Sequence, residues 1–189
     1  KNPLTEVWEW KKGCCESDNQ AVIYIDEECL HKVVYWAVDH FNNTESVHAR
    51  YFSVDDPPPI ILVDVGQPQY TGGLLPHEYY VDAATPVWIN VTDGGPCRVG
   101  SVNLSVCVTY VTGDSDPVCT SYYIDQGMLH IDPLYFSDGD GIYYLNITAT
   151  DNLGNVAYHN STFIVDTSPP YPLKTVGVPH YTGVLPPGD

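Results

Sequence analysis

A short acidic stretch offers the first candidate for chemistry in this sequence. The segment SDGDG at 137–141 places Asp138 and Asp140 two residues apart, and Asp132 precedes it. Aspartates at alternate positions begin a typical calcium-binding loop, because calcium prefers carboxylate oxygens. The distal glutamate of an EF-hand is missing, and Asp-Gly pairs are also ordinary turn residues. The sequence therefore leaves two interpretations open here, a calcium site and a solvated turn.

A second set of acidic residues stands next to proline-rich segments. Asp55 and Asp56 precede Pro57, and Asp166 occupies the corresponding place before a later Pro-Pro pair. These carboxylates predict either calcium sites at joints between domains or charged ends for the strands that precede them. Calcium is the one cofactor that the sequence suggests, and no other metal is expected.

Catalytic motifs are absent from the sequence. The seven histidines are scattered, and no G-x-S-x-G elbow, H-E-x-x-H pair or phosphate-binding glycine loop occurs. We therefore expect a protein that is not an enzyme.

The cysteines favour disulfides over zinc, because they form no C-x-x-C pair and no histidine stands at metal-ligand spacing. Cys107 and Cys119 are expected to pair with each other. Cys29 is expected to pair with Cys14 or Cys15, which are adjacent and therefore poorly placed to bond each other. Cys97 and the other of Cys14 and Cys15 are left over, and they could bond across a domain joint, bond between subunits or stay free. The six candidates are Cys14, Cys15, Cys29, Cys97, Cys107 and Cys119.

Five N-x-[ST] sequons predict N-linked glycans. Together with the cysteines they predict an extracellular or cell-surface location. The expected glycosylation sites are Asn42, Asn90, Asn103, Asn146 and Asn160.

The net charge limits the partners. With 7 Lys and Arg against 24 Asp and Glu, the formal charge is −17, which repels nucleic-acid phosphates and anionic lipid. No run of 18 apolar residues predicts a membrane span, and no signal-peptide core opens the chain. We expect a soluble, processed segment.

Alternating apolar residues predict the elements that must position these groups. Val87, Ile89 and Val91 alternate with polar residues, and the same period recurs at 102–108 and 145–149. This period is typical of half-buried strands. Asn90, Asn103 and Asn146 fall on the outward phase, where a glycan fits. Frequent turn signals favour an antiparallel β-sandwich.

One segment is ambiguous by itself. In CLHKVVYWAVDHF, 29–41, the apolar spacing is helical. Its counterpart IYYLNITATDNLGN, 142–155, is rich in β-branched and aromatic residues and ends in a Gly-Asn turn, so both are predicted to be strands.

An internal repeat sets the domain organisation. Of the 23 positions from 54 to 76, 13 are identical to those 111 residues later, and Ala37, Asp39 and Asn43 recur at 149, 151 and 155, an offset of 112. A repeat of this length indicates domains of roughly 110 residues. It predicts a complete domain at 57–167, the later strands of another at 1–56, and the first strand of a third at 168–189. The expected strands of 1–56 include residues 5–10, 21–25, 31–39 and 48–54.

The segment YYLNITATDNLGNVAYHNSTFIVDTSPP resembles the last two strands of Ig-like repeats in prokaryotic surface proteins. EECLHKVVYWAVDHFNNTESVHARYFSVDDPPP and TPVWINVTDGGPCRVG extend the resemblance to tandem Ig-like domains of archaeal cell-surface and secreted proteins. The resemblance implies a scaffold, such as a stalk, an adhesin or a fibre subunit, and transfers no catalytic residue.

The incomplete ends suggest an assembly. An incomplete sandwich exposes a groove that an orphan first strand of a neighbouring copy can fill, and such a head-to-tail contact extends into a filament. The partners expected are copies of this chain. The alternative is that the segment was cut from a longer tandem chain.

Two other functions compete with a filament subunit. A flat exposed strip of Trp8, Trp10 and Trp36 would favour a carbohydrate-binding or adhesin module, because aromatic rings stack on sugars, whereas buried rings would favour a structural fibre. The chain could also be a passive stalk of a larger surface enzyme.

Overall fold

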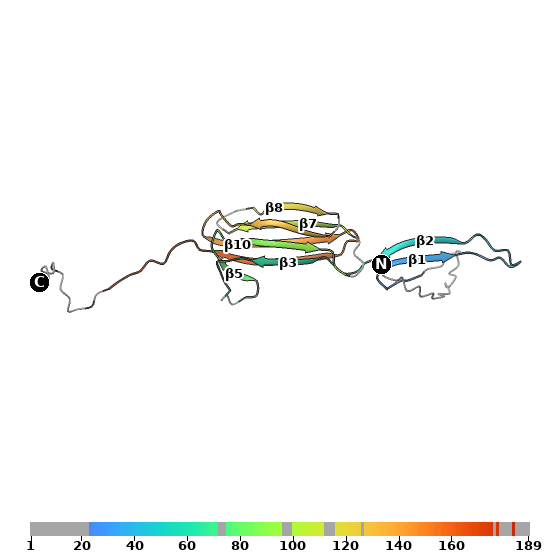
Figure 1. The fold of residues 1–189 in the computed structure, drawn as a ribbon, viewed down its shortest axis with the longest axis horizontal. Helices are drawn as coiled ribbons and strands as arrows, with labels where there is room; N and C mark the ends of the chain where they lie inside the picture. The colour runs from blue at the N-terminus through green and yellow to red at the C-terminus, as the bar shows by residue number, and fades with distance from the viewer. Residues whose placement is uncertain are drawn as a thin grey trace.

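The computed structural model describes residues 23–71, 75–95, 100–111, 116–125, 127–175, 177 and 183. Throughout this described part the regular secondary structure consists of β-strands, and no helix occurs. Figure 1 shows a sandwich in the middle, a separate hairpin at one end and an extended segment leaving the other end. The expected all-β, antiparallel architecture is confirmed at this level.

The separate hairpin consists of β1 (Cys29–Tyr35) and β2 (His48–Val54), which pair antiparallel and form a two-stranded sheet. The ambiguous segment at 29–41 is therefore strand at its start, as its counterpart predicted. Residues 23–25, the described part of the strand expected at 21–25, are not in a strand. A strand needs a hydrogen-bonded neighbour, and among the described strands β1 pairs with β2 alone.

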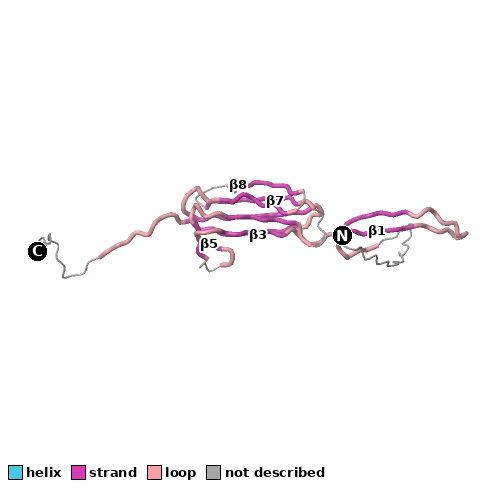
Figure 2. Tube along the Cα trace, viewed as in Figure 1, coloured by secondary structure: helices cyan, strands magenta, loops and turns pink. Residues whose placement is uncertain are grey.

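The sandwich contains a larger and a smaller sheet (Figure 2). The larger sheet has the order β4-β5-β11-β10-β7-β8, and the smaller has the order β3-β6-β9. All its pairs are antiparallel except β5 with β11, which is parallel. The strands of the larger sheet are β4 (Gln69–Tyr70), β5 (Glu78–Val81), β7 (Val102–Tyr110), β8 (Val118–Ile124), β10 (Gly141–Asp151) and β11 (Val156–Val165). Those of the smaller sheet are β3 (Ile60–Val65), β6 (Val87–Thr92) and β9 (Met128–Leu134).

The core lies between the two sheets and follows the predicted alternation. In β6 the side chains of Val87, Ile89 and Val91 are fully buried, as are Leu145 and Ala149 in β10. The alternate residues Ile142, Tyr144 and Asn146 of β10 are exposed. Each large aliphatic side chain buried in this way stabilises the fold by about 1.5–3 kcal/mol.

Aromatic rings complete the core at one end of the sandwich. Phe136 lies 4.6 Å from Phe163 and 4.9 Å from Tyr143 between ring centroids, and Tyr79 of β5 stacks on Phe163 at 5.2 Å. The Tyr143 hydroxyl donates to the Gly139 carbonyl at 2.8 Å. Burial raises the pKa of Tyr143, so this hydroxyl stays a donor at neutral pH.

Candidate functional site

Loop 151–155 connects β10 to β11 and is organised by one carboxylate. The Oδ1 atom of Asp151 accepts hydrogen bonds from the backbone N–H groups of Leu153 (2.9 Å) and Asn155 (2.8 Å). Its Oδ2 atom accepts a bond from Asn155 Nδ2 at 2.8 Å. A carboxylate that receives three N–H donors holds the turn in one conformation.

The segment after β2 docks against this loop, and we call this contact the internal joint. Asn155 Nδ2 also donates to the Asp55 carbonyl at 2.8 Å, across a sequence separation of 100 residues. At Gly94 an added Cβ atom would lie 2.2 Å from the Pro58 carbonyl oxygen, so only glycine permits this approach. The internal joint thus packs residues 55–58 directly on the sandwich.

Loop 39–43 lies within the connection between β1 and β2 and repeats the same bonds at the tip of the hairpin. Asp39 Oδ1 accepts from the N–H groups of Phe41 and Asn43, both at 2.8 Å, and its Oδ2 accepts from Asn43 Nδ2 at 2.7 Å. The Asn43 side-chain bond is the main cause that lowers the pKa of Asp39. Asp39 is exposed, whereas Asp151 is buried in the internal joint.

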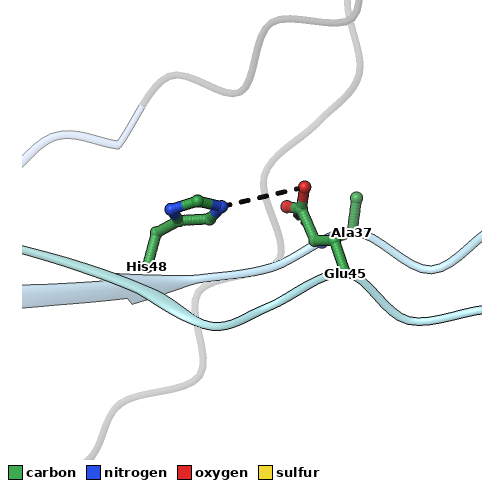
Figure 3. A network of polar contacts seen from close by, with 3 residues as sticks. All are labelled: Ala37, Glu45 and His48. Carbon is green, nitrogen blue, oxygen red and sulfur yellow. Dashed lines mark hydrogen bonds and ion pairs between the residues drawn. The ribbon is translucent and has the colours of Figure 1, made fainter.

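Next to loop 39–43, the side chain of Glu45 contacts residues on both sides of the loop, as Figure 3 shows. Glu45 Oε1 accepts a bond from the Ala37 N–H at 2.8 Å, and Glu45 Oε2 lies 3.9 Å from His48 Nε2. The His48 ring stacks on Tyr35 with centroids 5.2 Å apart. These contacts hold the two strands together where they enter the loop.

The opposite end of the sandwich is fastened by Asp140. Its Oδ1 atom accepts bonds from the N–H and hydroxyl groups of Thr167, the N–H at 2.9 Å, and its Oδ2 accepts from the Ser168 hydroxyl at 2.7 Å. The Thr167 side-chain bond is the largest of the causes that lower the pKa of Asp140. Asp140 therefore sets the direction in which the chain leaves β11.

The stretch 137–141 is a turn whose glycine is required by packing. Gly141 has φ of +152°, and an added Cβ atom would lie 2.8 Å from the Tyr110 ring. The Tyr110 hydroxyl donates to the Asp140 carbonyl at 2.9 Å. Asp138 is exposed in this turn, and Asp132 is exposed on β9.

Within the described ranges, one group of acidic residues is close enough to share a metal ion, and it consists of Asp55, Asp93 and Asp151. Asp132, Asp138 and Asp140, the residues suggested by the calcium-loop spacing, are not in it. The Asp140 carboxylate instead accepts hydrogen bonds from Thr167 and Ser168. Asp55 was anticipated at a joint. Asp93 and Asp151 were missed, although the recurrence of Asp39 at Asp151 marked the latter as part of a repeated loop.

The Cys107–Cys119 disulfide predicted from the sequence joins β7 to β8, with an S–S distance of 2.09 Å. Cys29 is also disulfide-bonded, while Cys14, Cys15 and Cys97 lie outside the described residues. Two expected glycosylation sites, Asn146 and Asn160, lie in cross-strand register with the Cys107–Cys119 disulfide. Asn160 pairs with Asn146, Asn146 pairs with Cys107, and Cys107 pairs with Cys119 across four neighbouring strands.

The side chains of the five sequon asparagines are exposed or half-buried. Asn42 and Asn103 are exposed, as are Asn146 and Asn160. Asn90 is half-buried on the smaller sheet, where its Oδ1 atom lies 2.5 Å from His130 Nδ1. Its amide nitrogen, the atom that carries an N-glycan, is not used in that contact.

Of the three tryptophans whose exposure would distinguish a sugar-binding module from a structural fibre, the structure describes one. Trp36 is 40% exposed, and Trp8 and Trp10 lie outside the described residues. A strip of three rings is therefore not seen in the described part.

Comparison with protein-family models finds no match, and comparison with curated proteins finds no similar sequence. Among the described residues, no helix is long and apolar enough to cross a membrane.

Proposed function

We propose that this protein is a structural subunit of an extracellular, glycosylated filament in which copies with Ig-like domains join head to tail. The observation that carries the proposal is the match between the two ends. Loop 39–43 repeats loop 151–155 bond for bond, and Asp166 repeats Asp55 at an offset of 111 in the sequence. Loop 151–155 already binds Asp55 within the chain. Asp166 of one copy then fits loop 39–43 of the next.

The positions of the two ends support this geometry. Loop 39–43 lies at the tip of the hairpin, and residues 166–175 leave the sandwich on the opposite side (Figure 1). A contact between two different surfaces of the same molecule is heterologous, so each added copy presents the same free surface again. Such contacts extend into an open filament when the rotation between copies does not close a ring.

The exposed side chains of the hairpin support a strand donated by a second copy. Phe52 and Tyr35 correspond in the repeat to Phe163 and Ile147, which are buried in the sandwich core. In the segment after β11, Tyr171 and Leu173 are both largely exposed. Because alternate residues of an extended chain share a face, these two side chains can cover the hairpin together while the backbone extends its sheet.

The expected glycan at Asn42 is compatible with this contact. Asn42 has φ of +65°, and its counterpart Gly154 has φ of +92°. A Cβ atom added at Gly154 would meet nothing within 4 Å, even though Asp55 occupies that loop. A side chain at the equivalent place in an occupied loop 39–43 therefore points into open space.

The first test images native material by electron microscopy and measures the intact mass of the unfolded, non-reduced chain. We expect fibres that dissociate into units near 20.9 kDa plus glycan. A mass several times larger that reducing agent does not lower would replace the proposal with a covalent tandem chain.

A matched pair of variants tests the joint itself. D39N is expected to prevent fibre formation, because the neutral side chain organises loop 39–43 less well. D132N changes an exposed aspartate on β9 and should assemble normally. Fibres of normal length from D39N would contradict the proposed contact.

A further inference from the structure

We propose that the internal joint is a calcium site formed by Asp55, Asp93 and Asp151. One carboxylate oxygen from each residue lies within 4.8 Å of the other two. The three residues come from different elements: Asp55 follows β2, Asp93 follows β6, and Asp151 ends β10. Their relative exposures are 2%, 2% and 3%. This inference concerns a contact within one chain and does not depend on filament assembly.

The charges of Asp93 and Asp151 in this group call for a counterion. Three carboxylates this close repel one another strongly once water is removed, and burial of a charge is costly unless the charge is paired. Asp151 accepts three N–H hydrogen bonds, an arrangement that suits the ionised carboxylate. No ion pair within the described part of the chain includes Asp93 or Asp151; the pair found there joins His48 to Glu45.

Asp93 supplies the second, independent observation. Its Oδ2 atom accepts a hydrogen bond from the Gly100 N–H at 3.0 Å, whereas its Oδ1 atom is buried without any hydrogen-bond partner. A buried polar atom without a partner is rare in folded proteins and costs free energy. An ion between the three carboxylates gives this oxygen the partner that it lacks.

The donor atoms select the type of ion. All three are carboxylate oxygens, which suit calcium or magnesium and not the softer metals that prefer sulfur or imidazole. Calcium binds oxygens at about 2.3–2.6 Å, so two oxygens on opposite sides of one ion lie about 4.8 Å apart. Magnesium requires near-octahedral geometry at about 2.1 Å, usually keeps several of its waters and is bound through one or two carboxylates, whereas three buried carboxylates converge here. Calcium therefore fits the group better.

The ion would join the two parts of the molecule. Asp55 belongs to the segment that leaves the hairpin, whereas Asp93 and Asp151 belong to the sandwich. The joint already contains the Asn155 bond to the Asp55 carbonyl and the close approach of Gly94 to Pro58. A bound calcium ion would connect the carboxylate of Asp55 to those of Asp93 and Asp151 and fix the angle between hairpin and sandwich.

The test uses the purified full chain, freed of metal with a chelator and then titrated with calcium chloride in a calorimeter and in thermal unfolding. We expect one calcium ion per chain. At a hundredfold excess over the dissociation constant, the unfolding midpoint should rise by about 5–10 °C. Magnesium chloride at the same concentration should give a smaller rise.

Variants separate this site from nonspecific binding to an acidic protein. D93N should bind calcium at least about tenfold more weakly, since each lost charge weakens the site, and D132N should match the wild type. In chelator, the unfolding midpoint of D93N should be no lower than that of the wild type, because the substitution relieves the repulsion among the three carboxylates. This result would show that the variant folds. D55N provides the same test from the hairpin side.

Two results would overturn the inference. One is a wild-type chain whose unfolding midpoint does not respond to calcium, as expected if a side-chain cation or a shared proton balances the three carboxylates. The other is an equal calcium response in D93N and the wild type. Filament assembly is measured separately by microscopy, so failure here and failure of the proposed assembly are distinguishable.

Discussion

The hairpin β1–β2 and the hairpin β10–β11 have the same register but opposite environments. Cys29 pairs with Val54 as Gly141 pairs with Val165, and every later pair of β1–β2 recurs in β10–β11 at the same offsets. Yet Phe163 is 0% exposed and its counterpart Phe52 is 37% exposed. The two hairpins therefore share their pairing, and they differ in how far the described strands around them cover the face that carries these phenylalanines.

The difference lies in the neighbours. In the sandwich, β10–β11 is flanked by β7 and β5 and faced by the smaller sheet, so Phe163 contacts Tyr79 and Phe136. Phe52 stacks on His31, its neighbour across the hairpin, at 5.7 Å. An isolated two-stranded hairpin is marginal in water. The comparison teaches that the hairpin has the pattern of a sandwich element and lacks, among the described strands, the sheet that would cover it.

The largest expected effect comes from removing the segment proposed to cover the hairpin in the next copy. Deletion of 168–189 should abolish fibre formation, because the hairpin face of the next copy loses the donated segment that carries Tyr171 and Leu173. The core formed within 57–167 should remain folded, since its buried side chains lie before the deletion. Electron microscopy gives the first result and near-ultraviolet circular dichroism the second. Normal fibres from the truncated chain would refute donation of this segment.

Truncation of Phe163 and truncation of its counterpart Phe52 should change the free energy of unfolding by different amounts. F163A should destabilise the sandwich by about 3–5 kcal/mol, because it leaves a cavity in a packed core. F52A should change the unfolding free energy of the isolated chain by less than about 1 kcal/mol, as expected for an exposed site. Urea unfolding of both variants below the concentration needed for assembly provides the measurement. Equal losses would mean that the hairpin face is already covered within one chain.

Asn155 and Asn43 occupy corresponding positions in the two loops, and their substitution should affect stability differently because Asn155 also donates to the Asp55 carbonyl. N155A removes that bond and the one to Asp151, and it should cost about 1–3 kcal/mol, because a buried carboxylate loses its donor. N43A removes only exposed contacts and should cost less than about 1 kcal/mol in the isolated chain. Thermal unfolding measures both. A larger loss in N43A would show that the two loops are not equivalent.

The smallest expected effect concerns pH. Burial, followed by the nearby His77, lowers the pKa of His159 below its usual value of about 6.5, and His159 Nε2 lies 2.7 Å from Ser161 Oγ. The unfolded chain therefore takes up a proton before the folded chain does. The stability of the fold is complete above pH 6.5 and falls as the pH drops through this value toward the lowered pKa.

H159Q removes this titration, so its unfolding midpoint should fall less than that of the wild type between pH 7.5 and 5.5. H40Q changes an exposed histidine in the connection between β1 and β2; it serves as the control and should follow the wild type. Identical pH profiles for H159Q and the wild type would exclude His159 as a source of the pH dependence.

Part of the fold and of the candidate sites could be predicted from the sequence. The alternation of Val87, Ile89 and Val91 predicted a buried strand face, because side chains of a strand point alternately to its two sides. The Cys107–Cys119 pair was also predicted, since the cysteines flank a short connection between consecutive strands. The calcium-loop spacing at 138–140 was a weaker guide, because it describes one segment and does not reveal that Asp140 would bond Thr167.

The sequence alone indicated the inward faces of β6, β7 and β10 and the recurrence of Asp39 and Asn43 at 151 and 155, because these depend on local periodicity and on residues a few positions apart. The tertiary structure decided which strand ends meet. Asp55, Asp93 and Asp151 are separated by tens of residues, and no local pattern relates them. They come together because strand order and register place the ends of β2, β6 and β10 at one joint, a result of packing over the whole sandwich.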